Sequence, residues 1–134
     1  MVVDTSALVA ILLNEPDAEI LSSTLAASSP RVISAVSVLE ASIVMESKKG
    51  EAGLALLDEL LTAAQFEVAT FDDAQQRAAR EAYRRYGKGR HPAGLNFGDC
   101  CSYALARARN DTLLFKGNDF AQTDIAQATP ISAH

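Results

Sequence analysis

The sequence has few of the features that mark membrane, secreted or zinc-binding proteins. Its longest uncharged apolar runs, such as residues 7–13, are too short to span a bilayer. It does not open with a basic segment followed by a hydrophobic stretch, so we expect no signal peptide. The two cysteines, Cys100 and Cys101, are adjacent, which disfavours a disulfide and fits neither a zinc nor a redox motif. These absences predict a reduced, cytoplasmic protein without a membrane anchor.

The composition is that of one folded domain. Hydrophobic residues make up 49% of the 134-residue chain, which argues against disorder, and the length suits a single core. No repeat, linker or low-complexity tract divides it. Short apolar strands alternate with helices, which is typical of an α/β domain with a mostly parallel sheet. We therefore predict a single domain over residues 1–134, with four to five short strands flanked by helices in three layers.

Local signals set the expected order of elements. Strands are predicted at residues 1–4, 31–33, 66–69 and 113–115, with a short fifth strand near Ile131. Helices are predicted at residues 5–13, 16–27, 36–49, 51–64, 72–86 and 98–110, and Gly50 separates the third from the fourth. Residues 87–96 contain three glycines and a proline, so they are predicted to form a loop.

Four acidic residues stand where predicted strands end or helices begin. Asp4 follows the first strand, and Asp119 follows the fourth across a Gly-Asn turn. Asp99 opens a helix, where capping is the ordinary explanation. Glu40 lies in an apolar helical stripe, where a buried salt bridge with an arginine is the ordinary explanation. Because the ends of parallel strands and the starts of the following helices share one edge of a sheet, the four carboxylates can converge.

A cluster of this kind points to a metal ion. Two like charges about 4 Å apart repel by about 4 kcal/mol at an effective dielectric constant of about 20, so several carboxylates cannot share a pocket ionised without a cation. Oxygen ligands without a histidine or thiolate cluster indicate Mg²⁺ or Mn²⁺. Such an ion can generate hydroxide from water and stabilise charge on a phosphoryl group. Thr5 or Ser6 could fix an acid's rotamer or hold a metal-bound water, and Asp124 is a rival to Asp119.

Positive charge is concentrated in one stretch. The net charge of −5 would ordinarily discourage nucleic-acid binding. However, residues 77–91 contain six basic residues and one acid, a net +5 that leaves −10 on the rest of the chain. Arg84, Arg85, Lys88 and Arg90, with nearby aromatic rings, could contact phosphates and stack bases. The alternative is a solvated helix end whose positive charges suit the helix dipole.

Four segments resemble the signature of the PIN-domain family in their order and spacing, and the match extends over essentially the whole chain. They are residues 3–8 (Val-Asp-Thr-Ser-Ala-Leu), 37–40 (Ser-Val-Leu-Glu), 97–104 (from Phe-Gly-Asp-Cys to Tyr-Ala) and 117–120 (Gly-Asn-Asp-Phe). The short length and the Leu-Asn-Phe-Gly-Asp-Cys run resemble the VapC toxins of type II toxin–antitoxin pairs.

The resemblance implies a Mg²⁺- or Mn²⁺-dependent endoribonuclease that hydrolyses phosphodiester bonds in RNA. By motif position, the acidic quartet is Asp4, Glu40, Asp99 and Asp119. Asp4 and Asp99 would be the more direct metal ligands, and Glu40 would orient water or a second ion. The supporting residues would be Thr5, Ser6 and Asn118. Family members form homodimers and are silenced by a cognate VapB-like antitoxin whose tail fills the acidic groove.

Two other functions stay open at this point. Asp4 could be the phosphoryl-accepting nucleophile of a haloacid-dehalogenase-like phosphatase, although that pattern places a second aspartate where this chain has Ser6. A non-catalytic interaction module would use the acids to bind Mg²⁺ for regulation. A covalent aspartyl-phosphate on Asp4 would favour the phosphatase, and the absence of RNA cleavage at any metal concentration would favour the module.

Overall fold

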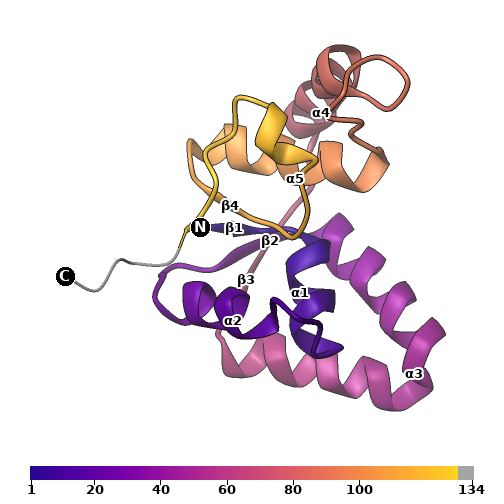
Figure 1. Ribbon diagram of the computed structural model, residues 1–134, viewed down its shortest axis with the longest axis vertical. Coiled ribbons are helices and arrows are strands. Elements are labelled where there is room, and N and C mark those ends of the chain that lie inside the picture. Colours follow the sequence, from indigo (N-terminus) through magenta and orange to yellow (C-terminus); the bar gives the residue numbers. More distant parts are fainter. Residues whose placement is uncertain (130–134) are drawn as a thin grey trace.

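Strands and helices alternate along residues 1–129, the part of the chain that the computed structural model describes (Figure 1). The strands are β1 (Val2–Val3), β2 (Val32–Ser34), β3 (Glu67–Ala69) and β4 (Leu113–Leu114). The helices are α1 (Thr5–Leu12), α2 (Ala18–Ala26), α3 (Ala35–Ala63), α4 (Asp73–Tyr86) and α5 (Phe97–Arg109), with a short 3-10 helix at Phe120–Gln122. The predicted α/β class is confirmed. The fifth strand predicted near Ile131 lies outside the described residues.

The four strands form one parallel sheet in the order β3-β2-β1-β4. Val2 of β1 pairs with Val32 on one side and with Leu113 on the other. The chain winds outward from β1 through β2 to β3 and then returns to place β4 on the opposite side of β1. Open parallel sheets bind ligands at such a reversal, just beyond the carboxyl ends of the strands. Asp4, the residue that follows β1, occupies this position.

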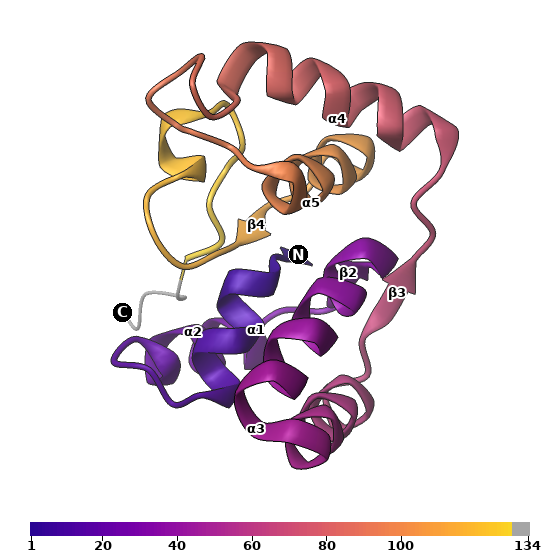
Figure 2. The ribbon, with the colours of Figure 1, turned by 90° about the vertical axis from the view of Figure 1, so that its right-hand side faces the viewer.

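Helices cover both faces of the sheet, as Figure 2 shows, with α4 and α5 on one face and α1, α2 and α3 on the other. Successive strand residues point to opposite faces. Val2 therefore packs in the core beneath α4 and α5, whereas Val3 packs with Leu8 of α1 and Leu57 of α3. The predicted three-layer arrangement is confirmed.

Helix α3 (Ala35–Ala63) consists of two helical segments that meet at a kink. The kink lies at Gly50, whose φ of 61° and ψ of −148° are not helical, so the prediction of two helices that meet at this glycine is confirmed. A positive φ of this size favours glycine, which explains why the helix breaks at this residue. Within residues 1–129, even this long helix lacks the apolar character that a membrane span requires, as do the others.

Candidate active site

Asp4 lies directly beyond β1, where its side chain caps α1 and is 2% exposed. Its Oδ2 atom accepts a hydrogen bond from the backbone N–H of Ser6 at 3.0 Å. Its Oδ1 atom accepts a hydrogen bond from the hydroxyl of Ser102 at 2.6 Å. The protein therefore orients both carboxylate oxygens, and each keeps lone-pair capacity for a further ligand.

Glu40 and Asp99 meet at the start of α5. A Cβ atom on Gly98 would stand 2.3 Å from Oε2 and 2.7 Å from Oε1 of Glu40, so glycine at this position leaves room for the Glu40 carboxylate. The next residue, Asp99, forms a capping box with Asn96. Its Oδ2 accepts from the Asn96 N–H at 3.1 Å, and its own N–H donates to Oδ1 of Asn96 at 2.9 Å. Capping therefore does explain one role of Asp99, as the sequence allowed, and Glu40 is its close neighbour.

Asp119 lies on the loop that follows β4. The backbone N–H of Lys116, in the same loop, donates to the hydroxyl of Ser6 at 3.0 Å, and the Lys116 ammonium pairs with Glu15. These contacts hold the loop against α1. Asp119 and Asn118 are both exposed, and the Asp119 side chain makes no capping hydrogen bond. Ser6 thus supports the site by orienting Asp4 through its backbone and by anchoring the Asp119 loop through its hydroxyl.

The four acids share one electrostatic environment. The pKa of Asp99 is raised from 3.8 to about 7, mainly because the group is buried; the hydrogen bond from Asn96 opposes this shift. The charges of Asp4, Asp119 and Glu40 contribute smaller parts of the same increase. Within residues 1–129, no basic group forms an ion pair with any of the four acids. The arginine salt bridge considered for Glu40 is therefore not found in the described part of the chain.

Asp124, the rival to Asp119, is compensated by other groups. It accepts a hydrogen bond from the Tyr103 hydroxyl at 2.6 Å and pairs with Arg107 at 3.5 Å and with Arg85 at 3.8 Å. Partial burial works against ionisation, but Tyr103, Arg107 and Arg85 together hold the pKa of Asp124 below its ordinary value. Its charge is not among those that raise the pKa of Asp99. These contacts favour Asp119 as the fourth acid.

The two cysteines lie buried beside the acids and are not joined by a disulfide, as their adjacency predicts. Burial, and to a smaller degree the charge of Asp99, raises the pKa of Cys100 to about 11. Burial and the charge of Glu40 raise the pKa of Cys101 to about 11. Both groups therefore remain thiols at neutral pH, and nucleophilic or metal-binding thiolate chemistry is not expected here.

The acids crowd together without forming a preassembled cage. Within residues 1–129, no three His, Cys, Asp or Glu side chains are arranged so that they could hold a metal ion as they stand. The donors that share the site are nonetheless all carboxylate oxygens, which Mg²⁺ and Mn²⁺ prefer as ligands. The site thus fits such an ion in donor chemistry and in charge. Asp4 and Asp99 are the acids that other parts of the chain orient most directly.

Sequence reasoning missed two serines beneath the acids. Ser102 orients Asp4, and its hydroxyl oxygen lies 3.3 Å from that of Ser37. Thr5, by contrast, donates its hydroxyl to the backbone carbonyl of Ser37 at 3.1 Å and orients no acid directly. The sequence does carry a signal for Ser102, because it is three residues after Asp99 and therefore shares its helix face.

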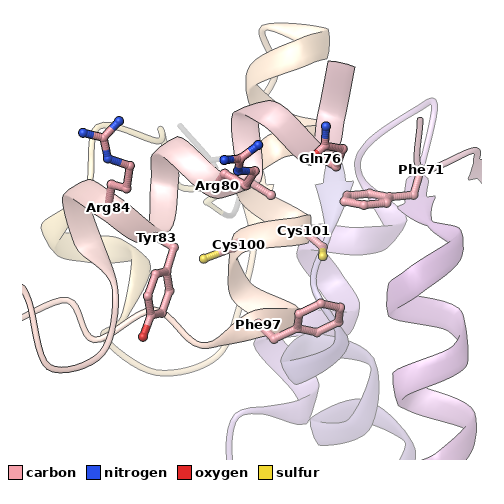
Figure 3. Close-up of a pocket in the computed structure, with 9 residues that line it drawn as sticks. Phe71, Gln76, Arg80, Tyr83, Arg84, Phe97, Cys100 and Cys101 are labelled. Carbon is pink, nitrogen blue, oxygen red and sulfur yellow. The ribbon is translucent and has the colours of Figure 1, made fainter. Parts of the chain in front are cut away.

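A cavity of about 580 Å³ lies between α4 and α5, beside the start of α5 (Figure 3). Figure 3 shows aromatic side chains and two arginines around it, and the lining includes Phe71, Arg80, Tyr83, Arg84 and Phe97. Phe97 is 75% exposed and also lines a second apolar hollow with Glu40. The cavity and the acidic site are therefore neighbours.

The predicted RNA-binding residues differ in their surroundings. Arg84 lines the cavity and lies 3.4 Å from Glu81, whereas Arg85 is held by Asp124 and by the ring of Tyr86. The guanidinium of Arg90 lies 5.5 Å from the centre of the Tyr83 ring. Within residues 1–129, Lys88 forms no ion pair. Arg80, which the prediction left out, lines the cavity, whereas Arg85 does not.

Comparison with known proteins bears on this geometry. The model of the PIN domain family matches residues 1–126. A Ribonuclease VapC from Mycolicibacterium smegmatis is 56% identical over 126 residues, which cover 94% of this chain and 98% of that protein. Ribonuclease VapC30 from Mycobacterium tuberculosis is 52% identical over 94% of this chain and 96% of its own length.

Solved structures agree with the fold. Mycobacterium tuberculosis VapC20, described as a sarcin-ricin loop cleaving toxin, aligns with a TM-score of 0.79 at 17% identity over 96% of this chain and 98% of its own. A toxin–antitoxin complex from Klebsiella pneumoniae aligns with a TM-score of 0.69 at 15% identity over 97% and 98% of the two chains. At these identities the likeness concerns the fold alone. Since the family model spans nearly the whole chain and the relatives above agree with it, this chain belongs to the PIN domain family.

Proposed function

We propose that this protein is a divalent-cation-dependent endoribonuclease and the toxin of a VapBC-like toxin–antitoxin pair. The observation that carries the proposal is the crowding of four carboxylates, from four different segments, at the reversal point of the sheet. The names of the relatives, Ribonuclease VapC and Ribonuclease VapC30, support the RNA substrate and the toxin role. The cytoplasm is the proposed location.

The cation is proposed to be Mg²⁺ or Mn²⁺, held by Asp4 and Asp99. Because the acids do not form a complete cage, water would supply the remaining ligands, as it commonly does for Mg²⁺. When bound, the ion would activate water and stabilise charge on the phosphoryl oxygens. Without a cation, the crowded carboxylates would repel the phosphates of RNA, so we expect cleavage to depend on it.

The remaining residues of the quartet have proposed roles that follow from their positions. Glu40, held against Gly98, would accept a hydrogen bond from the attacking water and so orient it. Asp119 would complete the anionic site from its exposed loop, where Asn118 is its neighbour. Thr5 and Ser6 would support the site indirectly, through α3 and through the Asp119 loop.

RNA is proposed to approach along α4 and the loop that follows it. Phosphate contacts there would come from Arg84, Lys88 and Arg90. Arg80 is a further candidate, because it lines the cavity together with Arg84. The exposed ring of Tyr83 could stack on a base. Arg85 is the weakest of the predicted contacts, because Asp124 already binds it.

Two protein partners belong to the proposal. A cognate VapB-like antitoxin would neutralise the toxin, and one of the structures similar in fold is a toxin–antitoxin complex. A second copy of this chain is proposed to cover the apolar face of α3. Leu39 and Ile43 are each 61% exposed on that face, so one copy of the chain does not bury these two side chains. Large exposed apolar side chains in a row are typical of protein interfaces.

The phosphatase alternative is disfavoured by the surroundings of Asp4. A nucleophilic oxygen must be reached in line by a substrate phosphorus, whereas Asp4 is 2% exposed and both of its oxygens accept hydrogen bonds. An ion needs only one free lone pair, so the same burial is compatible with a ligand role.

The test is RNA cleavage by the purified protein with Mg²⁺ or Mn²⁺, compared with the same reaction in EDTA. We expect Asp4→Asn and Asp99→Asn to reduce the cleavage rate by about 100-fold or more while the protein stays folded. Asp124→Asn is the matched control, because that carboxylate is paired elsewhere, and it should cleave normally. Wild-type rates in either site variant would contradict the proposal. An aspartyl-phosphate on Asp4 would favour a phosphatase. Cation binding without cleavage of total RNA would favour a regulatory module.

A further inference from the structure

A buried chain of hydroxyl groups runs beneath the acids. Ser102 of α5 is 1% exposed and donates to Oδ1 of Asp4 at 2.6 Å. Its oxygen lies 3.3 Å from the hydroxyl oxygen of Ser37 in α3, which is also 1% exposed. Thr5 of α1 donates to the backbone carbonyl of Ser37 at 3.1 Å. Three helices therefore meet through hydrogen bonds directly below Asp4.

Hydrogen-bond chemistry gives this chain a direction. An ionised carboxylate can only accept, so the single O–H of Ser102 points to Asp4. The Ser37 hydroxyl is then the donor in its contact with Ser102. Hydrogen bonds to a charged acceptor are shorter and stronger than neutral ones, which agrees with the 2.6 Å distance. Ser102 thus fixes one oxygen of Asp4 while the backbone N–H of Ser6 fixes the other.

The serines also connect Asp4 to the two acids on helices. Ser37 lies three residues before Glu40 and Ser102 three residues after Asp99, a spacing that places each serine on the same helix face as its acid. The contact between the two hydroxyls therefore sets the separation of α3 and α5 about one helical turn from Glu40 and Asp99. One pair of small polar groups links all three acid-bearing segments.

We propose that Ser102 is a positioning residue, backed by Ser37, that holds the Asp4 carboxylate in the orientation with which it binds a divalent cation alongside Asp99. The inference rests on the proposed function, because it takes the acids to be the cation's ligands. Partners that hydrogen-bond to metal-binding side chains typically change metal affinity or activity by about 10- to 100-fold when they are removed.

The direct test is Mn²⁺ binding to the metal-free protein, measured by isothermal titration calorimetry in the absence of RNA. Ser102→Ala should raise the Kd for Mn²⁺ by about 10- to 100-fold. Ser37→Ala keeps the bond between Ser102 and Asp4, so its increase should be smaller. Ser42→Ala is the matched control, because Ser42 lies on α3 but donates only to the Val38 carbonyl, and its Kd should equal that of the wild type.

Kinetics separate positioning from simple structural support. Ser102→Ala should lower kcat for RNA cleavage and leave KM for RNA unchanged, because the proposed phosphate contacts lie on α4 and the loop that follows it, not on the hydroxyl chain. A purely structural serine would lower the unfolding midpoint and leave the Mn²⁺ affinity of the folded protein unchanged, which would overturn the inference. If Ser102→Ala does not fold, Ser37→Ala decides by the same two measurements.

The outcomes also distinguish this inference from the proposed function. Loss of Mn²⁺ binding in Asp4→Asn together with wild-type binding in Ser102→Ala would overturn the role of Ser102 and leave the proposed function intact. Weaker Mn²⁺ binding in Ser102→Ala, in a protein that cleaves no RNA, would support the positioning role while the ribonuclease proposal fails. Wild-type Mn²⁺ binding in Asp4→Asn would overturn both, because there would be no ligand to position.

Discussion

Two groups of carboxylates in this molecule have opposite surroundings. Asp99 lies among three other acids, and burial and their charges raise its pKa to about 7. Asp124, by contrast, accepts a hydrogen bond from Tyr103 and pairs with two arginines, and these three groups lower its pKa. Carboxylates that lie close together without basic partners, and whose pKa values are raised as a result, are typical of functional sites. The contrast therefore identifies the acidic site more sharply than the number of acids does.

The largest expected effect comes from disturbing the crowded group without changing its charge. In Gly98→Ala the new methyl group would stand 2.3 Å from Oε2 of Glu40, so the flexible end of that side chain must move. Misplacing a catalytic group by about 1 Å can cost about 100-fold in rate, and we expect a loss of this order in RNA cleavage. The free energy of unfolding should change by only about 1 kcal/mol, because alanine favours a helix more than glycine does.

A second variant controls the interpretation of Gly98→Ala. Glu40→Asp shortens the side chain and relieves the contact, so the two changes together should cost less than the sum of their separate effects. Additive losses, or wild-type cleavage in Gly98→Ala, would show that the close approach of Glu40 to Gly98 is not needed for activity. Cleavage rates and urea unfolding, measured on the same preparations, decide this.

The next largest effect is expected on stability, when the paired carboxylate of Asp124 is removed. Asp124→Ala removes the acceptor of the Tyr103 hydroxyl, whose residue is 4% exposed, and we expect the free energy of unfolding to fall by about 1 to 2 kcal/mol. In a Tyr103→Phe background the same change should cost less, since no hydroxyl is left without a partner. RNA cleavage should stay normal. A folded Asp124→Ala protein that has lost cleavage would instead place Asp124 in the active site.

The sequence predicts the acidic site because its signals are local. Asp4 follows an apolar strand, and Glu40 and Asp99 lie near helix starts, so parallel-sheet geometry alone brings them to one edge. The choice between Asp119 and Asp124 is different, because it depends on Arg85 and Arg107, which come from two helices. The two arginines reach Asp124 only when α4 and α5 are packed together, and the spacing of these residues in the sequence does not predict that contact.

The hydroxyl chain and the outer face of α3 show the same limit. Ser37 and Ser102 are 65 positions apart, and their contact follows from the separation of two helices, which strand and helix signals do not determine. An apolar helix stripe can be buried or covered by a partner, and periodicity does not distinguish the two. Only the packed structure shows that Leu39 and Ile43 are exposed on the outer face of α3.

The smallest expected effect is a change in the pH dependence of stability. It compares Asp99 and Asp124 most directly, because their pKa values are shifted in opposite directions. Asp99 has a folded-state pKa of about 7 against an ordinary 3.8, so between about pH 4 and 7 the unfolded chain loses its proton while the folded protein keeps it. Wild-type stability should therefore fall as pH rises through this window. Asp99→Asn removes that loss and should be more stable than the wild type at pH 8, by about 1 kcal/mol because solvent screens a partly exposed group.

Asp124 should show the opposite sign in the same experiment. Its pKa is lowered in the folded protein, so its contribution to stability is present above its ordinary pKa and is lost as pH falls below it. Asp124→Asn should thus be less stable than the wild type at neutral pH and approach it in acid, whereas Asp99→Asn gains at neutral pH. Urea unfolding from pH 3 to 8 in EDTA measures both. If Asp99→Asn has no advantage at pH 8, burial and the neighbouring acids do not raise the pKa of Asp99 in solution, and the contrast between Asp99 and Asp124 is wrong.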